Sequence, residues 1–306
     1  MMYYFLLALS KLIPSRARRQ RFVAWSRSRF NVHAIVETAL SDHRKALEPA
    51  IERSVYYHSH LFERPTVLTV AETLEAITAG KSIARFGDGE LLSLQAQQNA
   101  FQRPDTRLAG RLKEVLSSDE EGLLVGIYRH NYDLSNDLDD SERRWYIDNA
   151  AWMHAIAGLY LRRDVVYAAT ETTHAYQMYE DFDSADYFRR FRDLWDGAHV
   201  VLIHGDGIFD NLTYDIFDNA AAVDHILAPR RDAFDQYDQI LERALQAPPD
   251  SIVLVVLGPT ATVLAYDLHR AGYRALDLGH IAKSYDWWLK GRSGKGEANA
   301  EFYAPD

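Results

Sequence analysis

The feature that most constrains the fold is an alternation of short apolar runs with longer segments of helical periodicity. Runs such as "SIARF" (82–86), "GLLVGIY" (122–128) and "IVLVVL" (252–257) are continuous rather than interrupted at every second residue. Strands that are buried on both faces have this pattern, and they occur mainly in parallel sheets. The sequence therefore predicts an α/β fold with a mostly parallel sheet covered by helices on both faces.

The chain divides by pattern into two regions. Residues 1–65 predict a helical extension that ends near Pro65, and residues 66–306 carry the α/β pattern. The apolar start, "MMYYFLLALSKLIP", is shorter than a membrane span and precedes the basic stretch "SRARRQRF". Two interpretations stay open. Residues 1–20 contact an anionic membrane peripherally, or they dock on the protein's own body or on a partner subunit of a homo-oligomer.

Composition excludes several classes of protein. Hydrophobic residues make up 47% of the 306 residues and charged residues 25%, as in soluble globular proteins. A net charge of −10 disfavours nucleic acid as a partner, because phosphate binding needs clustered Lys and Arg. The chain has no Cys, which excludes disulfides, Cys-ligated zinc and thiol catalysis. These features are compatible with a cytoplasmic location, at the inner face of the plasma membrane if residues 1–20 bind lipid.

Polar or glycine-rich loops follow four of the expected strands, and this places the candidate site. In open α/β sheets, ligands bind beyond the carboxyl ends of the strands. We therefore expect one site to be assembled from the loops at 84–90, 126–133, 202–211 and 256–262.

The loop "GDGE" contains the strongest candidate for metal binding. In extended backbone, residues two apart point to the same side, so Asp88 and Glu90 could converge on one Mn²⁺ or Mg²⁺ ion before a helix over 90–98. Gly87 and Gly89 would let the chain turn sharply and let a ligand approach. Arg85, just before them, is placed to hold phosphate. The alternative is a plain turn with a carboxylate at a helix start.

Two further loops are candidates for binding the substrate. Gly258, Pro259 and Thr260 begin a helix directly after a strand, which suits a phosphate, although a tight turn with Thr260 as a cap explains them equally well. Gly205, Asp206, Asp210 and Asn211 could bind a ribose, an acceptor sugar or metal. A turn and a helix cap are the alternative for this second group.

One histidine is expected to belong to the site. His280 follows a strand end near Asp277 and could act as an acid/base or phosphate-binding group. If the reaction deprotonates a hydroxyl group, Asp206, Asp210 and His280 are the candidates for the base.

Four motifs together resemble the GT-D type glycosyltransferases, a family of bacterial sugar transferases. They occur in order within residues 66–290: "SIARFGDGE", "LLVGI", "APRRDAFDQYDQIL" and "VLGPTATVLAYDLHRAGYRALDLGHI". The resemblance implies a Rossmann-like fold and transfer of a hexose from a nucleotide diphosphate sugar, typically UDP-linked. It also implies that Asp88-Gly89-Glu90 is the Asp-x-Glu element that binds divalent metal with the donor diphosphate. Asp277 and His280 match the family's Asp-x-Gly-His element.

The sequence also departs from that family at one place. Many relatives carry a Thr-Arg pair after the middle strand, whereas this chain has "ATETTHAYQM", which leaves the roles of Glu171, Thr172 and His174 open. We predict a metal-dependent hexosyltransferase that acts on a glycan, lipid-linked or protein-linked acceptor in surface polysaccharide or glycoprotein biosynthesis. The alternatives are a Rossmann-type methyltransferase or dehydrogenase, against which the missing GxGxxG motif weighs, and a non-catalytic scaffold of a glycan assembly complex.

Overall fold

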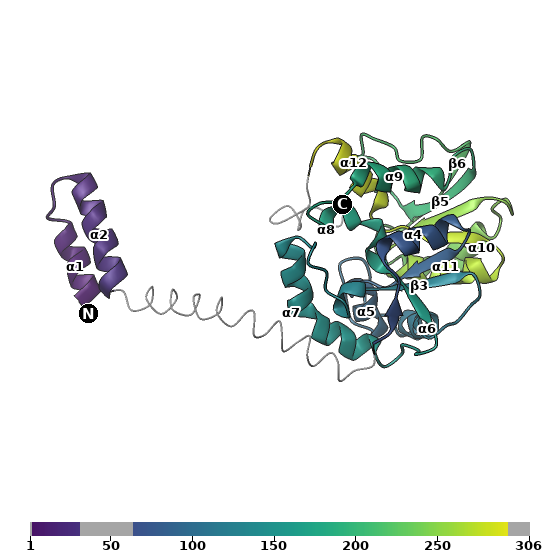
Figure 1. Ribbon diagram of the computed structural model, residues 1–306, viewed down its shortest axis with the longest axis horizontal. Coiled ribbons are helices and arrows are strands. Elements are labelled where there is room, and N and C mark those ends of the chain that lie inside the picture. The colour runs from purple at the N-terminus through teal and green to yellow at the C-terminus, as the bar shows by residue number, and fades with distance from the viewer. Residues whose placement is uncertain (1, 31–63, 293–306) are drawn as a thin grey trace. The chain divides into compact units, whose positions relative to one another are not determined.

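The computed structural model describes residues 2–30 and 64–292. The chain forms two compact units, Met1–Phe62 and Glu63–Asp306. In the first unit, the helices α1 (Met2–Ser10) and α2 (Arg16–Phe30) pack side by side as a hairpin (Figure 1). Within the described ranges, no helix combines the length and the apolar character that a membrane crossing requires.

The second unit is built on an eight-stranded sheet within residues 64–292, in the order β1-β4-β3-β2-β8-β7-β5-β6. Each pair of neighbouring strands runs parallel, which confirms the predicted fold class. The two-residue strand β1 was not predicted from the sequence. The strands are β1 (Thr66–Val67), β2 (Ser82–Arg85), β3 (Leu123–Ile127), β4 (Val166–Ala169), β5 (His199–Gly205), β6 (Ala222–Ala228), β7 (Ile252–Val256) and β8 (Arg274–Asp277).

Helices connect the strands and cover the sheet (Figure 1). Their starts follow ordinary capping chemistry, as at α4, where the Thr69 side chain accepts from the Glu72 N–H and Glu72 reaches back to the Thr69 N–H at 2.8 Å. The helices are α4 (Val70–Thr78), α5 (Asp88–Leu94), α6 (Thr106–Leu116), α7 (Asp140–Ala157), α8 (Ala175–Met178), α9 (Ser184–Asp193), α10 (Tyr237–Ala244), α11 (Pro259–Arg270) and α12 (Ile281–Leu289).

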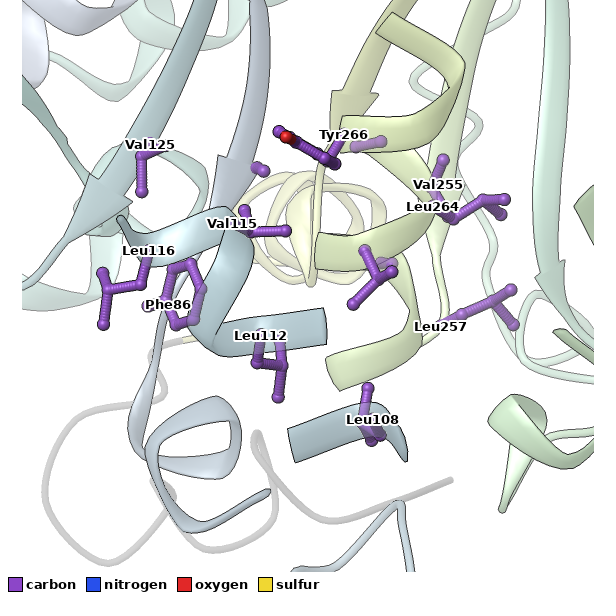
Figure 2. Close-up of a cluster of buried hydrophobic side chains, with 14 of the residues drawn as sticks. Phe86, Leu108, Leu112, Val115, Leu116, Val125, Val255, Leu257, Leu264 and Tyr266 are labelled. Carbon is purple, nitrogen blue, oxygen red and sulfur yellow. The ribbon is translucent and has the colours of Figure 1, made fainter. Parts of the chain in front are cut away.

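The continuous apolar runs are explained by two hydrophobic cores, one on each face of the sheet. Successive residues of a strand point to opposite faces, so Ile83 packs in the core with α4, α9 and α12, while Ala84 packs in the core with α6 and α11. Figure 2 shows part of the second of these cores, with Leu112 and Val115 of α6 and Leu264 of α11 among its packed side chains. A strand between two cores has no polar face, and its sequence is apolar throughout.

The parallel arrangement brings all the strand carboxyl ends to one edge of the sheet. β2 lies in the middle of the sheet between β3 and β8, although β8 is the last strand in the sequence. The chain therefore builds one side of the sheet with β3 and β4 and the other with β5 to β8. A reversal of this kind leaves a crevice at the carboxyl edge, where ligands bind in such folds.

Candidate active site

A pocket of about 470 Å³ lies at the carboxyl edge of the sheet. All four loops that the sequence analysis selected contribute to it, together with the loops after β4 and β8. The structure thus brings many of the predicted site residues together: Arg85, Gly87, Asp88, Gly89, Glu90, Gly205, Gly258, Asp277 and His280 all line this pocket. Asp206, Asp210, Asn211, Pro259 and Thr260 do not line it.

The predicted extended backbone at Asp88 and Glu90 is wrong. Helix α5 begins at Asp88 rather than at Glu90, with Gly87 as its N-cap, and it ends at Leu94 rather than at 98. Residues two apart on a helix point in different directions, so the two carboxylates do not converge through strand geometry. The Glu90 carboxylate turns back and accepts from the Gly87 N–H at 2.7 Å, while Asp88 is exposed at the pocket.

The electrostatics of Glu90 are compatible with cation binding. Burial, together with the negative charges of Asp277 and Asp88, raises the pKa of Glu90 to about 7. A divalent cation would offset this accumulation of negative charge, and carboxylate oxygens are its preferred ligands. Residues 2–30 and 64–292 contain no cluster of three or more His, Cys, Asp or Glu suited to a metal ion. Asp88 and Glu90 therefore fit a cation only if a substrate diphosphate or water completes its coordination.

Arg85 is held by the protein rather than presented to a ligand. Its Nη2 donates to the Asp277 carboxylate and its Nε to the Asp277 carbonyl, both at 2.9 Å. Its Nη1 donates to the Thr170 carbonyl. The same nitrogen donates to the Thr173 hydroxyl at 2.8 Å. Because most of its N–H groups already have acceptors, the structure does not support Arg85 as the phosphate ligand that the sequence predicted. Arg85 and Asp277 instead tie the ends of β2, β4 and β8 together.

A glycine beside this ion pair makes the arrangement possible. Gly279 has φ +48°, and a Cβ at this position would lie 2.1 Å from the Arg85 Nη2. Only glycine accepts both the left-handed backbone and the close approach of the guanidinium. The next residue, His280, begins α12 as its N-cap and lines the pocket. Sequence analysis selected His280 for the site but gave no role to Gly279, the glycine of the Asp-x-Gly-His element.

The loop after β5 contributes apolar side chains to the pocket rather than carboxylates. Ile208, Phe209 and Leu212 line it, whereas Asp206, Asp210 and Asn211 are exposed outside its lining. Gly205 also lines the pocket, and a Cβ there would lie 2.9 Å from the Arg230 Cα. The strand end at Gly205 thus lets the backbone around Arg230 come close to the pocket.

The start of α11 forms a tight turn whose N–H groups are used within the turn rather than presented to a phosphate. Pro259 has no N–H, and the Thr260 and Ala261 N–H groups donate to the carbonyls of Leu257 and Gly258 within the turn. Thr260 is buried at the second helical position, so the expectation that it caps the helix is wrong. Gly258 is the N-cap and lines the pocket with φ +52°, close to the Phe101 side chain.

Several pocket residues were missed by the sequence analysis. Two are cations, Arg230 after β6 and Lys283 on α12, and three belong to α7, Glu142, Trp145 and Tyr146. Arg230 is exposed and makes no hydrogen bond or ion pair with the described part of the chain. Arg230 lies in the motif "APRRDAFDQYDQIL", but that motif was given no role in the site. No local motif distinguishes the residues on α7 and α12, because a pocket wall provided by the outer turn of a helix looks like any amphipathic helix in sequence.

The segment that departs from the family pattern lies beneath and beside the pocket. Glu171 is fully buried, and its Oε1 accepts from the Tyr146 hydroxyl at 3.2 Å and the His130 N–H at 3.3 Å. Thr172 is also buried, and its hydroxyl donates a hydrogen bond to the Ala169 carbonyl. His174 lines the pocket. Burial and the positive charges of Arg85 and His280 lower the pKa of His174 to about 3.

The His174 environment predicts a pH dependence of stability. The unfolded state takes up a proton on this histidine below its ordinary pKa of 6.5, whereas the folded state takes it up only near 3. Stability is therefore complete above pH 6.5 and falls as the pH is lowered, with a slope from this group of at most about 1.4 kcal/mol per pH unit. We expect His174→Gln to flatten the free energy of urea unfolding between pH 6.5 and 4.5. An unchanged slope in the variant would contradict the assignment.

Comparison with known proteins defines the class to which this fold and pocket belong. The family described as "Glycosyltransferase GT-D fold" matches residues 83–305, and the chain belongs to this family. The resemblance that the sequence motifs indicated is thus confirmed for family and fold.

Individual relatives come from streptococci. The chain is 31% identical over 234 residues to "Probable glycosyl transferase Gly" of Streptococcus gordonii, covering 75% of this chain and 34% of that protein. It is 28% identical over 235 residues to "Glycosyltransferase GlyD" of Streptococcus pneumoniae serotype 4, covering 74% of this chain and 28% of that protein. The chain therefore spans about a third of the length of these relatives.

Solved structures show the same fold. A domain of unknown function 1792 described as having a distinct glycosyltransferase fold superimposes with a TM-score of 0.73 and 27% identity, covering 81% of this chain and 88% of that one. A glycosyltransferase of the same domain type from Streptococcus sanguinis gives a TM-score of 0.70 and 29% identity, covering 76% of this chain and 88% of that one.

Proposed function

We propose that this chain transfers a hexose from a nucleotide diphosphate sugar, with UDP as the nucleotide, to a hydroxyl group of a glycan, lipid-linked or protein-linked acceptor. Surface polysaccharide or glycoprotein biosynthesis is the process that would use such a reaction. The observation that carries the proposal is the position of Asp88 and Glu90, two carboxylates in the first turn of α5 that both line the pocket. A carboxylate pair with few other ligands suits a cation that the substrate itself helps to coordinate.

Asp88 and Glu90 are the residues that would hold Mn²⁺ or Mg²⁺. When bound, the cation would neutralise charge on the diphosphate as the nucleotide departs. A proton competes with the cation at Glu90, because the pKa of its carboxyl group is raised to about 7. The Gly87 N–H holds the Glu90 carboxylate in a fixed orientation, so the site is organised before the substrate arrives.

Cationic side chains on one side of the pocket are suited to the diphosphate. Arg230 and Lys283 reach the pocket from β6 and α12 and would attract phosphate oxygens. His280 lies on the same side of the sheet and is placed better than Asp206 to exchange a proton with a reacting group, since Asp206 lies outside the pocket lining. The ion pair of Arg85 and Asp277 fixes the loops from which these groups project.

A turnover assay tests the proposed function against its rivals. We expect the full chain to release UDP from a UDP-hexose in the presence of Mn²⁺, measured for UDP-glucose, UDP-galactose and UDP-N-acetylglucosamine. A methyltransferase or dehydrogenase would instead act on S-adenosylmethionine or NAD. Binding of those cofactors together with no turnover of any nucleotide sugar would contradict the proposal.

We also propose that the α1–α2 hairpin contacts an anionic membrane surface. Residues 1–30 contain seven Lys or Arg and no Asp or Glu, namely Lys11, Arg16, Arg18, Arg19, Arg21, Arg27 and Arg29. Apolar side chains are exposed on the same hairpin, with Phe5 61%, Leu12 76% and Trp25 47% exposed. A peripheral membrane helix binds in two ways: its apolar side chains insert at the boundary between headgroups and acyl chains, and its basic side chains are attracted to anionic headgroups. The hairpin exposes side chains of both kinds.

Co-sedimentation with lipid vesicles checks this contact. We expect the full chain to pellet with vesicles that contain one quarter phosphatidylglycerol and not with pure phosphatidylcholine. Changing Arg16, Arg18 and Arg19 to Gln should weaken the binding substantially, because each basic residue near the surface contributes about 1 kcal/mol. Changing the exposed Lys81, Arg144 and Arg163 to Gln serves as a charge-matched control. If equal amounts of protein pellet with both kinds of vesicle, or if the α2 substitutions leave the pelleted amount unchanged, the hairpin does not bind anionic lipid and the proposal is wrong.

A further inference from the structure

We infer that the wall formed by Tyr128, Glu142 and Trp145 is the subsite for the hexose of the donor, and that Glu142 recognises its hydroxyl groups. This inference rests on the proposed function, because it divides the same pocket into a sugar end and a nucleotide end. It concerns residues outside the sequence motifs that identified the family.

The pocket is asymmetric in charge about the central strand β2. The side built by β5 to β8 contributes Arg230 to the lining, and Lys283 reaches it from α12, the helix that follows β8. The side built by β3, β4 and α7 contributes no Lys or Arg to the lining described here, and Glu142 is the one Asp or Glu that it contributes. A diphosphate would be attracted to the first side and repelled from the second. The uncharged part of the donor is therefore expected at the second side.

The side opposite Arg230 is an aromatic wall. Tyr128 and Trp145 are partly exposed, and their ring centroids lie 5.5 Å apart at an interplanar angle of 63°. Tyr146 packs behind them, with its ring centroid 5.1 Å from that of Trp145. Contacts between rings at these angles fix the aromatic side chains and leave apolar surface facing the pocket. Such a surface suits the C–H face of a sugar ring or the face of a base.

Glu142 distinguishes between these two ligands. It lies on the first turn of α7 and is only 7% exposed, yet it lines the pocket. A hexose presents several hydroxyl donors, and a carboxylate can accept from more than one of them. Uracil presents two carbonyl acceptors and a single N–H donor on its pairing edge, so a carboxylate beside it meets mostly other hydrogen-bond acceptors. The wall therefore matches a sugar better than a base.

The wall also adjoins the place where the reaction would occur. The position of a Cβ on Gly87 would be 3.3 Å from the Tyr128 hydroxyl and 3.0 Å from the Glu90 Oε2. The anomeric carbon of the donor is bonded to the terminal phosphate oxygen, which the carboxylate site would hold. A sugar that continues from this point, away from Arg230, reaches Tyr128 first and then Trp145. The diphosphate thus lies between the hexose and the nucleoside, as its covalent order requires.

Calorimetric binding of two ligands to the same variants tests the inference. With Mn²⁺ present, Glu142→Gln should weaken the binding of the UDP-hexose that the wild type binds most tightly by about tenfold, because the variant loses the charge that strengthens its hydrogen bonds to the sugar hydroxyls. The same variant should change UDP binding less than about twofold. Trp145→Phe should give the same pattern with a smaller effect. Arg144→Gln, an exposed position on the same helix outside the pocket lining, is the control.

The outcomes separate this inference from the proposed function. If the wild type binds neither UDP nor any UDP-hexose, the proposed function fails. If it binds UDP and the α7 variants weaken UDP and the UDP-hexose equally, the wall holds the base and the inference is overturned. If the variants change neither affinity while the wild type binds both ligands, the inference is also overturned. An unchanged thermal midpoint in Glu142→Gln and Trp145→Phe shows that the variants are folded.

Discussion

Replacement of Asp88 by Asn is expected to lower Mn²⁺-dependent release of UDP from a UDP-hexose by at least about 100-fold, the usual cost of removing one group that stabilises developing charge. Asp88 is exposed at the pocket, and its side chain makes no hydrogen bond within residues 2–30 and 64–292, so the substitution should leave stability nearly unchanged. Asn keeps the shape of the side chain and removes the charge. The initial rate of UDP release, measured over a range of Mn²⁺ concentrations, is the readout.

A matched control separates this local effect from a general loss of charge. Glu242→Gln changes an exposed carboxylate on α10 outside the pocket lining and should leave the rate unaffected. Asp206→Asn tests the other carboxylate that the sequence selected. If the Asp88→Asn variant releases UDP as fast as the wild type while the Asp206→Asn variant is inactive, the cation site lies at the end of β5 rather than at the end of β2, and the assignment is wrong.

Gly279→Ala is expected to destabilise the folded chain by about 3 kcal/mol, near the lower end of the cost of breaking a buried ion pair. The added Cβ would lie 2.1 Å from the Arg85 Nη2 and 3.1 Å from its Cζ, so the guanidinium must leave Asp277 and Thr173. Asp277 would then remain buried without its main partner. The free energy of urea unfolding is the measurement.

Backbone strain alone can be measured at another glycine. Gly197 has φ +64°, and no atom lies within 4 Å of a Cβ built there. Gly197→Ala should therefore cost only about 1 kcal/mol, the price of placing a side chain in left-handed backbone. Equal destabilisation in the two variants would mean that Arg85 moves away freely, and that its ion pair with Asp277 does not hold the loops together.

The fold was largely predictable because its main determinant is local. A strand packed between two cores is apolar at every position, as Ile83 and Ala84 illustrate, and this pattern is visible without knowing which strands pair. The Thr69 cap with Glu72 three residues later is likewise a local signal. The two-residue strand β1 escaped prediction because its pairing with β4 depends on residues 100 positions away in sequence.

The site was predictable only in part, because its geometry depends on contacts that are distant in sequence. The segment "GDGE" permits both an extended turn and a helix start, and the Gly87 N–H with the Glu90 carboxylate decides for the helix. Arg85 looked available for phosphate because its partner, Asp277, is 192 residues away. The pocket contribution of Glu142 and Trp145 depends on where α7 packs, which no motif in that helix reveals.

The central claim is that this pocket binds a nucleotide diphosphate through a cation held by Asp88 and Glu90. Its most direct test is a calorimetric titration of UDP into the full chain, once with Mn²⁺ and once with excess chelator. We expect UDP to bind with Mn²⁺ at least about tenfold more tightly than with chelator, a difference of about 1.4 kcal/mol, and we expect Asp88→Asn to abolish the difference. Equal affinity of the wild type for UDP with and without the cation would contradict the claim.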